Sequence, residues 1–288
     1  MIDVLRHFSL LEAPFALTPN PHLYFSWEHT QAILSGSECA LLRGDGILHI
    51  GGALGSGKTL LCRLLLAQLD TLGFNTAYLN APIADPAQLP ALVMQEFGIK
   101  PDPVIADYRT LGTFLLREFG RGRRSVLVID EAQALGPRGL ECLRLLSNLE
   151  TDAHKLLHIV MFGPPELGLM FMQPDMQHIA QRISFSLTTK PLPGKYVGDY
   201  LRFRLHRCTD DVFQADIFDA AAIDLLTTAS QGWPRLINLL ADKAMLAAYA
   251  EGSHRVTRQH LRLAITDTGH LSLPLPWRDR LANWRRAA

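Results

Sequence analysis

The stretch that decides the fold is Gly52-Ala53-Leu54-Gly55-Ser56-Gly57-Lys58-Thr59. It satisfies the pattern G-x-x-x-x-G-K-[ST] at each fixed position. It also lies between an apolar run, Ile47–Ile50, and a helical pattern that begins near Leu60. In such a strand–loop–helix arrangement, glycines allow backbone N–H groups to surround a phosphate, and the helix N-terminus adds partial positive charge. The stretch therefore predicts a P-loop that binds a nucleotide, and a glycine-rich turn that binds nothing is the less favoured alternative.

The residues of this loop have separate expected roles. We expect Lys58 to reach the β- and γ-phosphates and the Thr59 hydroxyl to ligate Mg²⁺. The other residues expected to contact the nucleotide are Gly52, Gly55, Ser56, Gly57 and Leu60. The expected ligands are accordingly ATP and Mg²⁺.

A second motif ends another apolar run, at Ser125-Val126-Leu127-Val128-Ile129-Asp130-Glu131. Four consecutive apolar residues favour a parallel strand buried on both faces, and the two acids then emerge at its carboxyl end. Asp130 is expected to hold Mg²⁺ through its water shell, as a Walker B aspartate does. Glu131 is placed to polarise the attacking water as a general base.

Composition describes an ordinary globular chain with a neutral charge balance. Of 288 residues, 48% are hydrophobic, and 28 basic residues balance 28 acidic ones. A zero net charge argues against a strongly cationic nucleic-acid binder but leaves local basic patches open. Four scattered cysteines predict free thiols in a reducing compartment. No apolar run reaches the roughly 18 residues of a membrane span, so we expect a cytoplasmic protein.

The pattern of elements divides the chain into four parts. Residues 1–30 are rich in aromatics and interrupted by prolines, which predicts an extended arm packed on the body. Residues 31–192 alternate strand and helix patterns, which include a helix at Gly139–Leu149, a buried strand at Leu156–Phe162 and a strand at Ile183–Leu187 with one face against the core. Residues 193–268 carry helix patterns alone. Residues 269–288 form a basic tail in which Trp277 and Trp284 lie on one face of a potential helix.

Three features allow two interpretations each. His29 could meet the nucleotide base, although a structural histidine is the favoured interpretation. The cluster Arg121-Gly122-Arg123-Arg124 is read as a solvated turn more readily than as a nucleic-acid contact. The tail is either a docking element for a membrane surface or partner helix, or a segment that packs on the chain's own helical part.

Several blocks of the sequence together resemble one family, the AAA+ ATPases of the ExeA/GspA and MshM type. These blocks include the P-loop, Asp130-Glu131-Ala132-Gln133, Leu143–Glu150, Gln181-Arg182-Ile183 and Pro234-Arg235-Leu236-Ile237-Asn238. The resemblance covers about residues 5–268. The MshM-like branch fits best, because ExeA-type chains continue into a transmembrane segment and a peptidoglycan-binding part.

This resemblance implies an α/β P-loop core with a parallel sheet, followed by a small all-helical lid. It implies that Arg182 is an arginine finger that reaches into a neighbour's nucleotide site, and that Arg235 is the sensor-2 arginine of the lid. The resulting homo-oligomer, a ring or a filament, would act as an ATP-hydrolysing assembly motor or switch. Its context would be type IV pilus (MSHA-like) or secretion-system assembly, with peripheral contact to the inner membrane.

Two departures from the family pattern bear on hydrolysis. Pro164 stands where the family has a glutamine after the strand, at the sensor-1 position, and Gln177 stands where arginine is frequent. A proline cannot orient water, so ATP binding is a safer expectation than fast hydrolysis. Two alternatives therefore stay open: a DNA-associated regulator of the TniB type, and a nucleotide-gated scaffold with weak hydrolysis.

Overall fold

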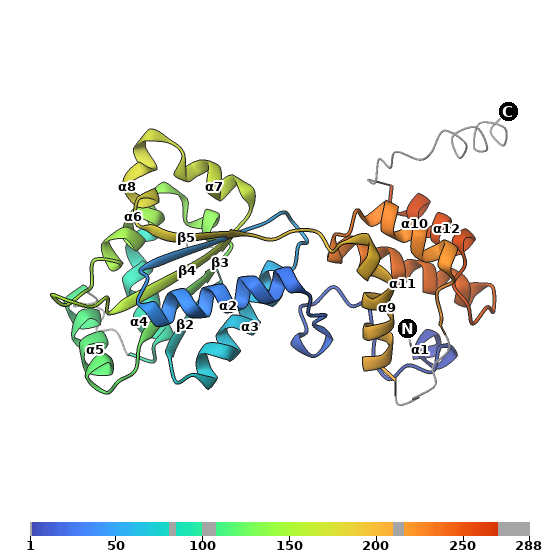
Figure 1. Ribbon diagram of the computed structural model, residues 1–288, viewed down its shortest axis with the longest axis horizontal. Helices are drawn as coiled ribbons and strands as arrows, with labels where there is room; N and C mark the ends of the chain where they lie inside the picture. Colours follow the sequence, from blue (N-terminus) through green and yellow to red (C-terminus); the bar gives the residue numbers. More distant parts are fainter. Residues whose placement is uncertain (1, 81–84, 100–107, 210–215, 270–288) are drawn as a thin grey trace. The chain divides into compact units, whose positions relative to one another are not determined.

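Five parallel strands form the centre of the first of two units, Pro19–Lys190. The computed structural model describes residues 2–80, 85–99, 108–209 and 216–269 (Figure 1). The strands are β1 (Ile47–Gly51), β2 (Asn75–Asn80), β3 (Ser125–Asp130), β4 (Leu157–Gly163) and β5 (Ile183–Thr188). Their spatial order is β2-β3-β4-β1-β5, with all neighbours parallel. All five carboxyl ends therefore meet at one edge of the sheet, which we call the carboxyl edge.

Burial of the strands follows their apolar content. Every residue of β1, β3 and β4 is buried, as expected for central parallel strands covered on both faces. β5 lies at the edge of the sheet, and its side chains alternate between half-buried and exposed positions. That alternation confirms the expectation from the sequence that one face of this strand packs on the core.

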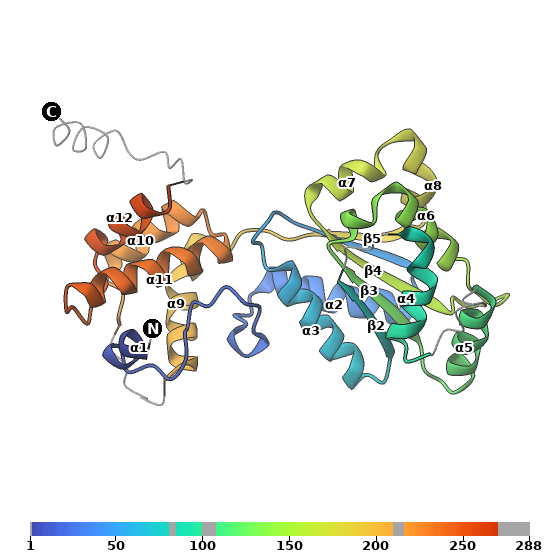
Figure 2. The same ribbon diagram turned by 180° about the vertical axis from the view of Figure 1, so that it is seen from behind.

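Helices cover both faces of the sheet and make three layers (Figures 1 and 2). On one face, α2 (Glu28–Arg43) and α3 (Lys58–Thr71) pack against side chains such as Val128 and Phe162. The other face packs against side chains such as Ile129 and Met161. It is covered by α4 (Leu89–Glu96), α5 (Tyr108–Gly120), α6 (Gly136–Leu146), α7 (Pro165–Phe171) and α8 (Gln177–Ala180).

The second unit is helical and combines the two ends of the chain, Met1–Thr18 with Pro191–Ala288. Its described helices are α1 (Ile2–His7), α9 (Val197–Arg207), α10 (Ala220–Ser230), α11 (Pro234–Ala250) and α12 (Arg258–Asp267). The ring of His7 stacks on that of His254 at 4.0 Å, and its Nε2 lies 2.9 Å from the Ser253 carbonyl oxygen. These contacts attach the first helix to the end of α11, so the start of the chain is part of this unit.

Most predicted helices and strands are present, and the main differences occur where a helix begins with a proline. The predicted helix Gly139–Leu149 is observed as Gly136–Leu146, because Pro137 occupies the first turn, where its missing N–H is harmless. The same property allows α7 to begin at Pro165, a helix that the sequence pattern did not predict. The arm begins with the short helix α1 before its prolines, so it is not extended throughout.

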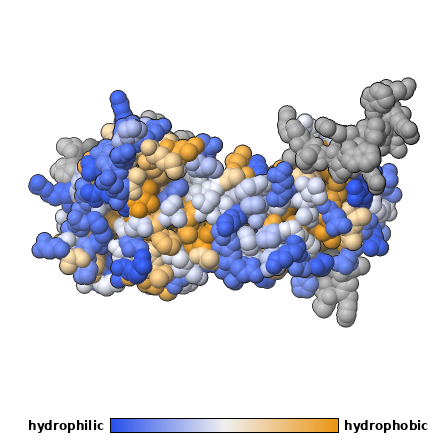
Figure 3. Space-filling model, turned by 45° about the horizontal axis from the view of Figure 1, so that its top comes forward, coloured by the Kyte–Doolittle hydropathy of each residue, from blue (hydrophilic) through white to orange (hydrophobic). Residues whose placement is uncertain are grey.

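Exposed apolar side chains are scattered. Figure 3 shows small apolar areas separated by polar ones on the visible face. The large exposed ones include Leu54 in the P-loop and Leu169 and Met172 at α7. Among the described residues, no helix is both long enough and apolar enough to cross a membrane. The tryptophans of the basic tail, Trp277 and Trp284, lie outside the described residues.

Candidate nucleotide site

The P-loop connects the carboxyl end of β1 to the N-terminus of α3. Gly52 continues the sheet edge by donating its backbone N–H to the Gly163 carbonyl, at 3.1 Å. Gly55 and Gly57 have φ angles of 79° and 90°, a region that only glycine adopts without strain. The loop therefore has its shape because glycine occupies these two positions.

Glycine is required at position 52 for a different reason: there is no space for a side chain. A Cβ atom added to Gly52 would lie 1.8 Å from Oγ1 of Thr189, the residue that follows β5. The Thr189 hydroxyl donates to the Ser56 hydroxyl at 2.8 Å, and both side chains are buried. Thr189 thus supports the P-loop from the neighbouring strand. The sequence motif gave no sign of this contact, because it arises from the β1–β5 pairing.

Lys58 begins α3 and is only 5% exposed. Its Nζ donates to the carbonyl oxygens of Gly52 and Ala53, at 2.8 and 3.1 Å. Burial lowers the pKa of the Lys58 amine, and the nearby carboxylates of Glu131 and Asp130 oppose that shift. The Lys58 side chain thus lies over the P-loop. The first backbone N–H groups of the 14-residue helix α3 have no intrahelical hydrogen-bond partner. Together these donors form a cradle suited to phosphate oxygens.

Thr59 and Asp130 lie together beside this cradle. Asp130 is the last residue of β3, and burial raises the pKa of its carboxyl. A hydrogen bond from Thr59 opposes that shift by favouring the carboxylate. A carboxylate next to a hydroxyl is a set of oxygen donors that Mg²⁺ prefers. These residues therefore fit the metal expected from the sequence, and the metal would supply charge neutralisation at the phosphates.

Glu131 follows Asp130 in an unusual backbone conformation. Its φ of 52° and ψ of 44° lie in the left-handed region, which is sparsely populated by residues other than glycine, asparagine and aspartate. Its N–H donates to Asp130 Oδ1 at 3.0 Å, and its carboxylate accepts a hydrogen bond from Gln133 Nε2 at 2.7 Å. Strain of this kind is found at functional sites, where the surrounding contacts hold the residue in place. Gln133 belongs to the block Asp130-Glu131-Ala132-Gln133 that carries the family resemblance, but the sequence assigned it no role.

Other predicted residues lie elsewhere. Arg182 directly precedes β5, so it is at the amino edge of the sheet, opposite the P-loop. The pairing aligns Ile47 with Ile183 and Gly51 with Thr188, and at about 3.3 Å per residue this strand separates the two edges by roughly 15 Å. Arg182 therefore does not contact the P-loop of its own chain. Arg235 is on α11 of the helical unit, and its role as sensor 2 stays a prediction.

His29 and the basic cluster have structural contacts. His29 Nε2 lies 2.8 Å from the Thr188 carbonyl oxygen. In the cluster, Arg121 and Arg123 form ion pairs with Glu118, which is 2% exposed. Arg124 donates to the Leu41 carbonyl oxygen at the end of α2, at 2.8 Å. These contacts favour the structural interpretation of both features.

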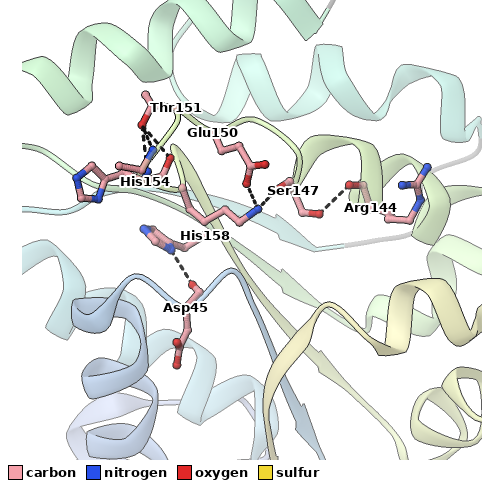
Figure 4. Close-up of polar contacts among 9 residues, drawn as sticks. Asp45, Arg144, Ser147, Glu150, Thr151, His154 and His158 are labelled. Carbon is pink, nitrogen blue, oxygen red and sulfur yellow. Dashed lines mark hydrogen bonds and ion pairs between the residues drawn. The ribbon is translucent and has the colours of Figure 1, made fainter.

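The amino edge of the sheet holds a cavity of about 390 Å³ and a short hairpin. The hairpin is closed by a hydrogen bond from the Thr151 N–H to the His154 carbonyl and by the Glu150–Lys155 ion pair (Figure 4). Beside it, His158 Nδ1 donates to the Asp45 carbonyl at 2.7 Å. Lys155 is the main cause, and Arg182 a further cause, of the lowered pKa of the Glu150 carboxyl. Arg182 is therefore close to this hairpin.

Comparison with known proteins identifies the fold. Residues 42–171 match the model of the AAA domain family. Over 282 residues, the chain is 38% identical to the general secretion pathway protein A of Aeromonas hydrophila. That alignment covers 96% of this chain and 50% of the relative, so the chain spans about half the length of the curated protein it matches.

Solved structures with low sequence identity share the same architecture. The ORC2 protein of Aeropyrum pernix superimposes with a TM-score of 0.67 at 18% identity, covering 91% of this chain and 72% of that one. The RuvB branch migration motor of Thermotoga maritima gives 0.52 at 18% identity, covering 84% and 69%. At these identities the likeness concerns the fold alone. The chain thus has the P-loop AAA+ fold, its residues 42–171 match the AAA domain family, and it is related in sequence to general secretion pathway protein A.

Proposed function

We propose that this chain binds ATP with Mg²⁺ and hydrolyses ATP at the carboxyl edge of its sheet. One observation carries the proposal: four predicted residues from two separate motifs, Lys58, Thr59, Asp130 and Glu131, come together there. Lys58 and the α3 N-terminus would hold the phosphates, and Thr59 with Asp130 would hold the metal. Glu131 would accept a proton from the attacking water.

Hydrolysis is proposed to need a second subunit. Arg182 lies at the opposite edge from the P-loop of its own chain, so its guanidinium is available to a neighbour's nucleotide. A fixed guanidinium stabilises the charge that develops on the transferred phosphoryl group. The active form is then a homo-oligomer, a ring or filament, in which subunits complete each other's sites.

The biological setting is proposed from the relative. Similarity to general secretion pathway protein A supports a role as an assembly motor or switch of a secretion system. A type IV pilus role, membership of the MshM-like branch and a place at the cytoplasmic face of the inner membrane remain expectations from the sequence. The DNA-associated alternative is not favoured, because the arginines of the basic cluster are already engaged with Glu118 and α2.

Two substitutions test the proposed activity. Lys58→Ala should abolish ATP binding measured by calorimetry, because the triphosphate loses its main point charge. Glu131→Gln should bind ATP normally and turn it over about 10²-fold more slowly. Lys243→Ala, which breaks an exposed ion pair with Asp267 on the helical unit, is the control and should change neither quantity. Unchanged ATP affinity in Lys58→Ala would reject the site.

A further inference from the structure

Gln133 makes a direct contact with the general base of the proposed site. It lies in a single 3-10 turn, Ala132–Leu135, which begins directly after Glu131. Its amide Nε2 donates to Glu131 Oε2 at 2.7 Å. A hydrogen bond to a charged group is stronger and shorter than a neutral one, so it fixes the direction in which the carboxylate points. This bond lies within the same turn in which Glu131 adopts its left-handed conformation.

The other end of the same amide has an unsatisfied acceptor. Gln133 Oε1 is buried and has no hydrogen-bond partner among the residues that the structure describes. A buried acceptor left without a partner is unfavourable, so such an atom normally meets a water or a ligand group. Gln133 Oε1 is therefore able to accept a hydrogen bond that the described residues do not supply.

The position of this oxygen relates it to the phosphate cradle. It lies 3.4 Å from the point that a Cβ on Gly163 would occupy, at the carboxyl end of β4. The Gly163 carbonyl in turn accepts the hydrogen bond from Gly52, the first residue of the P-loop. Gln133 thus extends from Glu131 to the strand end that adjoins the P-loop. The next residue, Pro164, carries no polar side chain.

We propose that Gln133 is the positioning residue for the attacking water, an inference that rests on the proposed ATP hydrolysis. Its Nε2–H holds the Glu131 carboxylate, and its Oε1 accepts a hydrogen bond from the water. The water oxygen forms the new bond to the γ-phosphorus, and the bridging oxygen leaves with ADP. One water proton passes to Glu131, and the products are ADP and inorganic phosphate. Gln133 thereby supplies the polar contact that Pro164 lacks.

Gln133→Met tests this role, since it keeps the side-chain length and removes both amide groups. The expected result is a fall in kcat of about 10-fold or more, with ATP affinity by calorimetry and KM within twofold of the parent. Gln68→Met is the matched control, because Gln68 on α3 also has a buried side-chain oxygen without a partner among the described residues. The control should leave kcat unchanged.

A double substitution separates positioning from a structural effect. Because Gln133 and Glu131 are proposed to hold the same water molecule, adding Gln133→Met to Glu131→Gln should cause almost no further loss of kcat. If Gln133→Met unfolds the chain, Gln133→Glu serves instead: it keeps the size but cannot donate to Glu131, so the same loss of kcat is expected. An unchanged kcat, fully additive losses, or an equal loss of ATP affinity would overturn the inference. Parental turnover by Glu131→Gln alone would reject the proposed function instead.

Discussion

The hydroxyl of Thr189 donates a hydrogen bond of 2.8 Å to the hydroxyl of Ser56, inside the domain and away from solvent. Thr189 follows β5 and Ser56 belongs to the P-loop after β1, so the bond joins the ends of two neighbouring strands. The same threonine limits the space at Gly52. The shape of the phosphate cradle therefore depends on a residue more than 130 positions away in the chain.

Gly52→Ala should weaken ATP binding strongly. Its Cβ would lie 1.8 Å from Thr189 Oγ1 and 2.8 Å from Ser56 Oγ, so the P-loop must shift. Overpacking of this kind costs about 1–3 kcal/mol, which corresponds to roughly 5- to 150-fold in the Kd for ATP. Calorimetric titration with ATP measures the change.

Two further variants check the cause of that loss. Gly46→Ala is the matched control, because its Cβ would meet only Lys155 Cε at 3.7 Å, so ATP affinity should stay the same. Thr189→Ala combined with Gly52→Ala removes the closest clash and should restore part of the affinity. An affinity of Gly52→Ala equal to that of the parent would show that the loop accommodates the methyl group.

Arg182→Ala should retain ATP binding and lose hydrolysis by about 10³-fold, as expected for an arginine finger. The lost activity should return in part when Arg182→Ala is mixed with Lys58→Ala. In the mixture, a Lys58→Ala subunit contributes its Arg182 to the intact P-loop of the other variant. ATP turnover of the mixture and of each variant alone is the measurement.

Activity of the parent should also rise with protein concentration, since a single subunit has an incomplete site. Arg117→Ala, on α5 with its guanidinium over the Phe114 ring, is the control and should behave like the parent. Co-assembly of the two inactive variants without recovery of turnover would mean that Arg182 acts within one subunit or has a structural role.

Pro164→Gln distinguishes two expectations. If the missing polar group at position 164 limits hydrolysis, as the sequence suggests, this substitution should raise kcat in the otherwise unchanged chain. If Gln133 already orients the water, Pro164→Gln in the otherwise unchanged chain should alter kcat by less than about twofold. Pro164→Gln should then raise kcat only when Gln133→Met is also present. Steady-state turnover of the four chains decides between them.

The stability of the sheet unit should decrease at acid pH through His49. This β1 side chain is 7% exposed, and its ring packs edge-on against Phe171 with centroids 5.5 Å apart. Burial lowers its pKa from the usual value of about 6.5. Below that value the unfolded chain binds a proton that the folded chain does not, so stability is full above pH 6.5 and falls as pH decreases.

Urea unfolding between pH 7.5 and 5.5 measures this effect. His49→Leu should reduce the dependence of the unfolding free energy on pH by at most one proton, about 1.4 kcal/mol per pH unit. His22→Leu, which alters an exposed histidine, should leave the dependence unchanged. Identical slopes for the parent and His49→Leu would show that His49 does not carry the effect.

The site residues that could be predicted are those whose positions depend on their neighbours in the sequence. Lys58 and Thr59 follow the glycines that shape their loop, and Asp130 follows the apolar run that buries its strand. Thr189 and Gln133 contribute through geometry that the sequence pattern does not show. Thr189 needs β5 beside β1, and Gln133 needs the left-handed turn at Glu131, which no local pattern indicates.

The helices and strands were likewise predictable only where the local sequence pattern decides them. Apolar runs predicted the three buried strands within one residue, because fully buried parallel strands are almost continuously hydrophobic. Prolines caused the errors at α6 and α7, where Pro137 and Pro165 begin helices that the sequence analysis placed later or missed. Proline both breaks a helix interior and suits a first turn, and only the surrounding packing decides which applies.

The opposite placement of Lys58 and Arg182 gives any assembly built through them a direction. Each subunit has one face that receives an arginine and another that provides one, so a two-fold symmetric pair cannot satisfy both. Subunits joined in this way repeat head to tail. In an open filament, the nucleotide site of one terminal subunit receives no arginine from a neighbour, whereas in a closed ring each site receives one. The number of active sites per subunit would therefore report whether the assembly is an open filament or a closed ring.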